Sequence, residues 1–204
     1  MRPIEKRIEP RSLTEHRCQP FADYDNYRQK DDLRASLVEE QGGLCCYCMQ
    51  RIAAHESRMK IEHWLCQEDN EEHQLNYQNL LGACLGSKGK PRKLQHCDSY
   101  KGKLPLSRNP ANAQHHVDRD LHYLADGTIR CSNAKFDQQL NNVLNLNVET
   151  LRNNRKAVLD GLKAWAQKTG RLRRQDITRE LRDRAFQEYG QVAVYWLKKR
   201  LARI

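Results

Sequence analysis

A chain of 204 residues, of which 38% are apolar and 30% are charged, is long enough to bury a core of ordinary size. It contains no run approaching the roughly 20 apolar residues that a membrane-spanning helix requires, so a soluble protein is expected. The formal net charge of +10 attracts polyanions and makes nucleic acid the first candidate partner, although such a charge also serves solubility alone.

The amino terminus predicts the cellular compartment of the protein, and the compartment in turn bears on the role of its cysteines. The opening segment MRPIEKRIEPRSL is basic and lacks both the apolar stretch and the cleavage site of a secretory signal. We therefore expect a cytoplasmic protein. Because the cytoplasm is reducing, the eight cysteines are expected to be metal ligands or small buried residues rather than disulfides.

The first 43 residues divide into an arm and a helix. Residues 1–24 contain three prolines and little periodicity, which predicts an extended amino-terminal arm. The segment DYDNYRQKDDLRASLVEEQGG then predicts a helix with Asp25 as its cap and with Leu33 and Leu37 on one face. The glycine pair Gly42-Gly43 is expected to end this helix.

Beyond residue 104 the pattern changes from short polar segments to a hairpin and two helices. HYLADGTIRC alternates around Asp126-Gly127, which predicts a two-residue β-hairpin. A helical periodicity begins near residue 135, and its buried face is expected to hold Val148, Leu151, Val158, Leu159, Leu162 and Trp165. A second long helix is predicted over 176–202, with an inward face of Ile177, Leu181, Ala185, Tyr189, Val192, Trp196 and Leu197. Its basic end, KKRLARI, is either a solvated face or a contact with nucleic acid or a partner.

Four of the cysteines have the pattern of a structural zinc site. Cys45 and Cys48 form a C-x-x-C pair, whose short loop lets both sulfurs face one ion. Cys84 and Cys97 supply the two further thiolates that a tetrahedral Zn²⁺ requires. Because a Lys-rich insertion separates Cys84 from Cys97, His96 is an alternative fourth ligand. The remaining thiols are expected to serve packing, and they are Cys18, Cys46, Cys66 and Cys131.

Residues suited to phosphodiester hydrolysis lie between and beside these cysteines. Glu62 and His63 place a carboxylate next to an imidazole, and in a strand the two side chains point to opposite faces. Asn79 offers an oxygen that would orient the imidazole, while Asp98 offers a second hard ligand for Mg²⁺ or Mn²⁺. Lys101 follows one helical turn after Asp98, where it would contact a phosphate.

The order of these parts over residues 42–104 resembles the zinc-stapled branch of the HNH endonucleases, which share a ββα-metal motif. The resemblance implies that Glu62 is the metal-binding acid, His63 the general base, Asn79 the middle asparagine and Asp98 the last position of the motif. This chain has Glu where the family more often has Asp, and Asp where it more often has Asn or His. Both replacements keep an oxygen ligand.

A narrower resemblance extends over most of the chain. The segments MRPIEK, GLCCYC, IEHW, YQNLLGAC, HCDSYKGK, LADGTI and LNLNVETLRNNRKAVLDGL are similar to the PtuB-like HNH nucleases of Septu and retron-associated anti-phage systems. That resemblance implies a defence nuclease acting with a PtuA-like ATPase. GSKGK lacks the spacing of a P-loop, which agrees with a division of labour between nuclease and ATPase.

Together these patterns predict an α+β, mainly helical protein with a zinc-stapled ββα-metal core, a β-hairpin and long carboxy-terminal helices. The expected division is an arm over 1–24, an HNH domain over 25–134 and a helical, partner-docking region over 135–204. The expected activity is metal-dependent hydrolysis of nucleic acid, with DNA favoured and RNA possible. The alternatives are a non-catalytic zinc module that binds nucleic acid or protein, and a ribonuclease toxin acting on tRNA.

Overall fold

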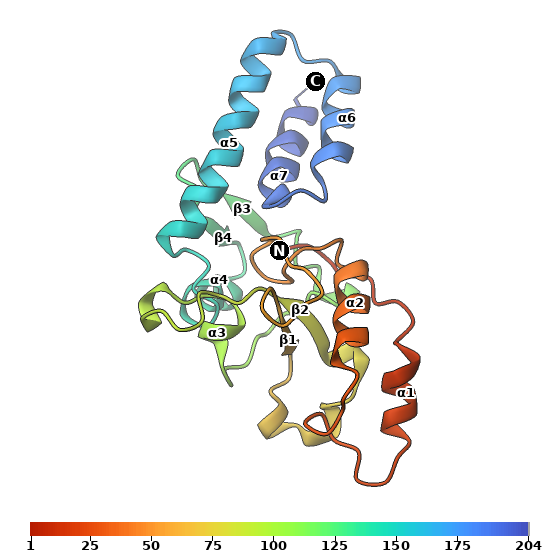
Figure 1. Ribbon diagram of the computed structural model, residues 1–204. Helices are drawn as coiled ribbons and strands as arrows, with labels where there is room; N and C mark the ends of the chain where they lie inside the picture. The colour runs from red at the N-terminus through yellow and green to blue at the C-terminus, as the bar shows by residue number, and fades with distance from the viewer. Residues whose placement is uncertain (204) are drawn as a thin grey trace.

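The computed structural model describes residues 1–203, and within them the chain forms seven α-helices and two small antiparallel sheets (Figure 1). The predicted α+β class is confirmed in this general form. Short 3-10 helices occur in the connections, at Gln67–Asp69, Glu71–His73, Tyr77–Asn79, Arg92–Leu94 and Ala113–His115.

The amino-terminal segment is more ordered than the sequence predicts. It contains helix α1 (Arg11–Arg17), which buries Leu13 against the core. The segment is also attached to helix α2 (Lys30–Glu40), because the Lys6 ammonium lies 2.5 Å from a carboxylate oxygen of Glu40 and both side chains are buried. This part of the chain is therefore packed against the body, and it is helical over Arg11–Arg17 where the sequence predicts an extended arm.

Helix α2 agrees with its sequence pattern except at its start, which lies several residues later than predicted. Leu33 and Leu37 are fully buried, as their shared face predicts. The helix ends before Gly42 and Gly43, both of which have positive φ values that glycine adopts without strain. It begins at Lys30, so Asp25 lies outside it and does not cap it.

The first sheet pairs strand β1 (Lys60–His63) with strand β2 (Leu80–Ala83) in antiparallel register, with His63 opposite Leu80. All four residues of β2 are buried, and helix α2 packs against this strand. The four-residue helix α3 (Asp98–Lys101) follows in the chain. Two strands and a helix thus occur in the predicted order, and their assignment as a ββα-metal core stays a prediction.

The predicted hairpin around Asp126-Gly127 is present as strands β3 (Leu121–Tyr123) and β4 (Ile129–Cys131). Gly127 has φ +83°, and a Cβ there would lie 2.0 Å from the Arg152 carbonyl oxygen. Glycine is required at this position both for the turn and for the close approach of the next helices. Helix α4 (Ala134–Asn142) follows β4 and packs against it.

The carboxy-terminal region contains four helices instead of the predicted two, because α4 is separate from the long helix that follows it and the last predicted helix is divided. Helix α5 (Glu149–Thr169) buries Leu151, Leu159 and Leu162, as its periodicity predicts. The single helix predicted over 176–202 is wrong, because the chain turns back between α6 (Arg174–Arg184) and α7 (Gly190–Leu201).

Contacts with a distant segment stabilise that turn. The Tyr189 amide donates to the Met49 carbonyl oxygen at 3.0 Å, and the Glu188 carboxylate accepts from the Arg51 amide at 2.7 Å. A Cβ at Gly190 would lie 2.2 Å from the Arg184 carbonyl oxygen, so the turn also requires glycine there. The break therefore comes from tertiary contacts that a helical period does not record.

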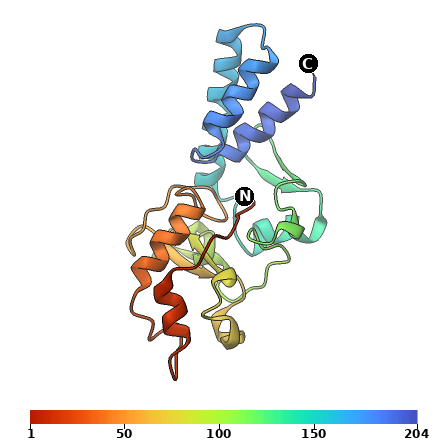
Figure 2. The same cartoon turned by 90° about the vertical axis from the view of Figure 1, so that its right-hand side faces the viewer.

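The buried residues form two clusters. The larger one contains residues from the amino terminus to Leu151 together with Tyr189. It includes Phe136 and Leu140 of α4, so α4 packs with the body. The smaller one lies among α5, α6 and α7 and consists of Leu162, Ile177, Ala193 and Leu197. Figures 1 and 2 show these three helices projecting from the body as one group.

No helix between residues 1 and 203 combines the length and the apolar composition needed to cross a membrane.

Candidate functional site: a cysteine cluster beside an acidic and histidine-bearing strand

The first two ligands of the candidate metal centre come from a tight turn. The Cys45 amide donates to the Gln50 carbonyl oxygen at 2.8 Å, and the Met49 amide donates back to the Cys45 carbonyl oxygen. Met49 has φ +69°, which turns the chain sharply after Cys48. This knuckle directs the sulfurs of Cys45 and Cys48 to the same side, as the C-x-x-C spacing predicts.

The other two ligands are brought together by a loop that closes on itself. Cys84 directly follows β2, and the Lys-rich insertion after it returns where the His96 amide donates to the Gly86 carbonyl oxygen at 3.0 Å. A Cβ at Gly86 would lie 2.1 Å from the His96 carbonyl oxygen, so only glycine permits this closure. The insertion therefore projects as a loop without separating Cys84 from Cys97.

The four sulfurs have the separations that a zinc ion requires. Cys45, Cys48, Cys84 and Cys97 are buried, and their sulfurs lie within 4.8 Å of one another. The Sγ–Sγ distances are 3.9 Å for Cys45–Cys97 and 3.7 Å for Cys48–Cys84. Zn–S bonds of about 2.3 Å at tetrahedral angles place two sulfurs about 3.8 Å apart. The cluster is therefore compatible with a structural zinc site that protein thiolates fill completely.

His96 lies beside the cluster. Its Nδ1 is 3.2 Å from the Cys97 sulfur and 4.0 Å from the Cys84 sulfur. An imidazole N–H in this position donates to a thiolate and so reduces the repulsion among four negative sulfurs. Cys97, and not His96, completes the four-residue cluster found within residues 1–203.

The remaining thiols are not part of this cluster. Cys46 is buried next to the knuckle, and burial raises the pKa of its thiol well above the usual value. Its sulfur is not part of the four-residue cluster, and the side chain packs in the larger buried core. Cys18, Cys66 and Cys131 also lie outside the cluster, as their sequence positions predict.

Glu62 is the most deeply buried charged residue of strand β1. Its exposed fraction is 2%, and its Oε1 accepts from the Tyr47 hydroxyl at 2.7 Å. The Lys101 ammonium lies 2.9 Å from the same oxygen. Burial raises the pKa of the Glu62 carboxyl well above its usual value, and the neighbouring Asp98 carboxyl raises it further.

Asp98 is the first residue of α3 and meets Glu62 from the other side. Its Oδ2 lies 2.6 Å from the Lys60 ammonium. Burial disfavours the charged form of Asp98, but the interactions with Glu62 and Lys60 outweigh this effect and lower its pKa. The two carboxyl groups predicted to hold a catalytic ion are thus in contact, and each has a lysine ammonium beside it.

His63 follows Glu62 and faces the opposite side of β1. Its Nε2 hydrogen-bonds to the Gln74 carbonyl oxygen at 3.0 Å, and the Tyr24 ring packs edge-on against it with centroids 4.5 Å apart. A carbonyl oxygen accepts only from an N–H, so this contact assigns the proton of the neutral ring to Nε2 and leaves Nδ1 as an acceptor. Burial lowers the pKa of His63, which favours the neutral ring.

Asn79 does not orient the His63 imidazole, contrary to the expectation from sequence. Its Oδ1 accepts from the Leu65 amide at 2.7 Å, and its Nδ2 donates to the carbonyl oxygens of Leu65 and His73. These bonds fix the backbone of the connection between β1 and β2, which also carries Gln74. Asn79 therefore supports the carbonyl that orients His63, and the sequence does not reveal Gln74 because its backbone makes the contact.

Lys101 lies inside the protein, contrary to the expectation of a phosphate contact. Its side chain is 1% exposed, and its ammonium lies between the Glu62 carboxylate and the His63 carbonyl oxygen, at 2.9 and 3.2 Å. The physical reason is that the buried Glu62 needs a compensating charge close by. A phosphate has no access to this ammonium in the arrangement described.

Gln41 and Tyr47 are further buried groups near the site that sequence reasoning missed. Gln41 bonds through its amide to the carbonyl oxygens of Leu44 and Gly82, and its oxygen accepts from the Gly82 amide. It thereby joins the knuckle to β2. A helix-end glutamine carries no sequence signal for such a bridge, because both partners are backbone groups.

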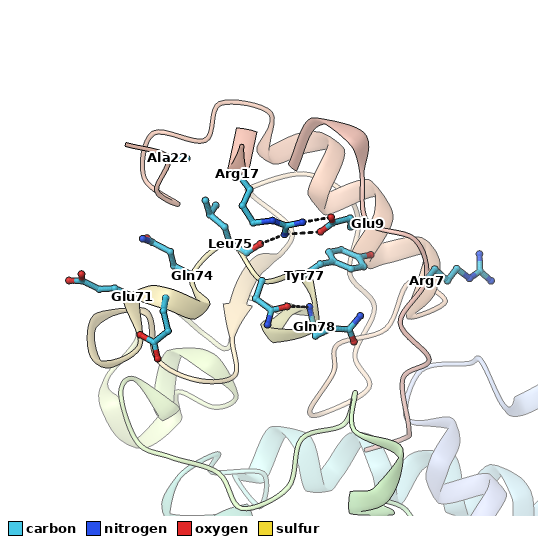
Figure 3. A pocket seen from close by; sticks show the side chains of 11 residues that line it. Arg7, Glu9, Arg17, Ala22, Glu71, Gln74, Leu75, Tyr77 and Gln78 are labelled. Atoms are coloured by element: carbon cyan, nitrogen blue, oxygen red, sulfur yellow. Dashed lines mark hydrogen bonds and ion pairs between the residues drawn. The ribbon is translucent and has the colours of Figure 1, made fainter. Parts of the chain in front are cut away.

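The connection between β1 and β2 is also covered by the amino-terminal segment. A hollow of about 600 Å³ lies between the two. Figure 3 shows side chains that line it, with the Arg17 guanidinium bonded to Glu9 and to the Leu75 carbonyl oxygen. Gln74 lies at the rim of this hollow, and Tyr77 lies in its wall. The segment over residues 7–22 thus helps to position the loop that holds His63.

The chemistry available at this site follows from these contacts. The four thiols suit Zn²⁺. Glu62 and Asp98 are hard oxygen ligands of the kind that Mg²⁺ and Mn²⁺ prefer, and Mg²⁺ commonly uses one or two carboxylates plus water and phosphate. No model of a known protein family matches this chain, and no curated protein matches it either.

Proposed function

We propose that the protein is a zinc-stapled, divalent-metal-dependent nuclease in which His63 is the general base. The observation that carries the proposal is the fixed His63 ring on the strand that also carries Glu62, whose carboxyl group meets that of Asp98. Its Nε2 donates to the Gln74 carbonyl, and Nδ1 has no hydrogen-bond partner among residues 1–203. A neutral imidazole with one nitrogen anchored and the other available can take a proton from water.

Glu62 and Asp98 would hold Mg²⁺ or Mn²⁺, which when bound would stabilise the negative charge on the leaving 3′-oxygen. Residues of the chain itself carry out the proton transfer and hold the base in position. His63 accepts the proton of the attacking water at Nδ1, and Asn79 fixes the connection that holds the ring. The products of this reaction carry 5′-phosphate and 3′-hydroxyl ends. Because the chemistry does not use a 2′-hydroxyl, DNA and RNA are both chemically possible substrates; of the two, we propose DNA as the favoured one.

The resemblance to PtuB-like HNH nucleases supports a place in an anti-phage system with a PtuA-like ATPase. The chain itself carries no P-loop motif, so nucleotide hydrolysis would come from that partner.

A non-catalytic zinc module is the second candidate, and one observation favours it. Lys60 and Lys101 already neutralise the two carboxyl groups, and such a cluster also serves a purely structural purpose. The two candidates differ in their dependence on divalent metal. A binding module keeps its affinity when Mg²⁺ is omitted, whereas nuclease activity is lost.

The test compares the wild type with His63→Ala on a plasmid, single-stranded DNA and total tRNA, in Mg²⁺ or Mn²⁺ and with or without the ATPase. Removing a general base is expected to lower the rate by about 10²- to 10⁴-fold. The matched control is His55→Ala, because His55 is an exposed histidine whose ring bonds only to neighbouring Ser57. Equal cleavage by the wild type and His63→Ala would overturn the assignment of the base.

A further inference from the structure

The positive charge of the chain is concentrated near its carboxy terminus. Residues 161–204 contain twelve Lys or Arg and four Asp or Glu, so this segment accounts for +8 of the net charge of +10. The group of helices α5, α6 and α7 therefore carries most of the field that attracts polyanions.

Part of this charge lines two adjoining hollows beside α5 and α7, which together are called the groove. Two adjoining hollows of about 700 and 270 Å³ have four residues in common, which are Lys163, Trp196, Arg200 and Arg203. Arg171 lies in the wall of the larger hollow and Lys199 in the wall of the smaller one. None of the described residues that line either hollow is acidic.

The basic groups of this groove are largely free to bind an anion. Within residues 1–203, Arg171, Lys199 and Arg200 form no ion pair with a carboxylate, and Lys163 has only a long contact of 3.6 Å with Asp160. Lys199 and Arg200 are exposed. Unpaired ammonium and guanidinium groups along one groove suit a ligand with repeated negative charges.

Aromatic rings lie between these charges. The Arg200 guanidinium carbon is 4.7 Å from the centroid of the Trp196 ring, and the Lys199 ammonium is 4.6 Å from that of Tyr195. Both rings are half-buried. Alternating basic and aromatic side chains are typical of single-stranded nucleic acid binding, in which the cations follow the backbone and the rings stack on bases.

We infer that this groove binds the backbone of a single-stranded nucleic acid, with a base stacked on Trp196. An acidic protein is the competing occupant. The groove favours nucleic acid because its lining has one sign of charge throughout, whereas the centres of protein interfaces are depleted of charged residues. The inference rests on the proposed function for its substrate class, and it concerns a surface separate from the cysteine cluster and His63.

The test measures binding without cleavage. A fluorescein-labelled 20-nucleotide oligo(dT) is titrated with full-length protein, with Mg²⁺ and Mn²⁺ omitted, over a series of NaCl concentrations, and polyglutamate is titrated as a competitor. The groove variant is Lys163→Gln/Lys199→Gln/Arg200→Gln. The matched control is Arg174→Gln/Arg179→Gln/Arg182→Gln, which removes three exposed charges from α6, outside the groove lining. Thermal unfolding verifies that both variants are folded.

The groove variant is expected to bind the oligonucleotide at least about tenfold more weakly. Because each single-strand phosphate contact contributes about 0.7 to the slope of log K against log[salt], the loss of three contacts should make that slope shallower by about 2. The control variant should bind as the wild type does. Trp196→Leu, which keeps an apolar side chain, should weaken binding by about tenfold through lost stacking.

Three results would overturn the inference: unchanged binding by the groove variant, an equal loss in the control variant, or polyglutamate that binds the groove as tightly as the oligonucleotide. The last result would assign the groove to an acidic protein. Binding is measured with Mg²⁺ and Mn²⁺ omitted and does not require cleavage, so a failure of the proposed nuclease activity leaves this measurement intact. Conversely, normal binding by the groove variant would refute the groove as a binding site and would leave the proposed nuclease activity unaffected.

Discussion

Loss of the zinc staple is the perturbation with the largest expected effect on stability. Replacing Cys48 with serine removes one of four buried ligands, and extracting the metal with a chelator removes the whole staple. The Cys45–Cys97 connection alone closes a loop of 52 residues. For a cross-link of that span, the loop-closure entropy restored to the unfolded chain corresponds to about 4 kcal/mol.

The metal-free protein should therefore unfold well below the loaded one. For a chain of this size, about 4 kcal/mol corresponds to a fall in Tm of roughly 8–16 °C. Thermal unfolding and a colorimetric zinc assay measure the two quantities together, and the loaded wild type should contain one zinc ion per chain. Cys18→Ser is the matched control, because Cys18 is exposed and lies outside the cluster. Equal zinc content and equal Tm in Cys48→Ser and Cys18→Ser would refute the assignment.

Two further substitutions test the supports of the site. Gln41→Leu should lower the free energy of unfolding by about 3 kcal/mol, because it leaves the buried amide of Gly82 without a partner. Exposed Gln29→Leu should change that free energy by less than about 0.5 kcal/mol in the same denaturant titration. Lys101→Met should lower the free energy of unfolding by about 3–5 kcal/mol, because it leaves the charge of the buried Glu62 without a partner. Adding Glu62→Gln to this variant should restore part of the lost free energy. Strict additivity of the two changes in a double-mutant cycle would contradict the ion pair.

The parts of the protein that local chemistry specifies were predictable from the sequence. The Asp126-Gly127 turn, the helix end at Gly42 and the buried faces of α2 and α5 follow from residue patterns within a few positions. The four clustered cysteines were also predictable, because the C-x-x-C pair directs two sulfurs to one ion and a tetrahedral site requires two further ligands.

Only the tertiary structure decided the roles that depend on distant partners. The turn between α6 and α7 forms where Tyr189 meets the Met49 carbonyl, and a helical period cannot anticipate a contact with a distant segment. Lys101 is inside because Glu62 is buried, and Asn79 bonds to the backbone because the β1–β2 connection folds over it. Sequence therefore determined which residues were available for the site, while packing determined which of them meet, since the free energies of burial and hydrogen bonding depend on neighbours that a linear pattern does not contain.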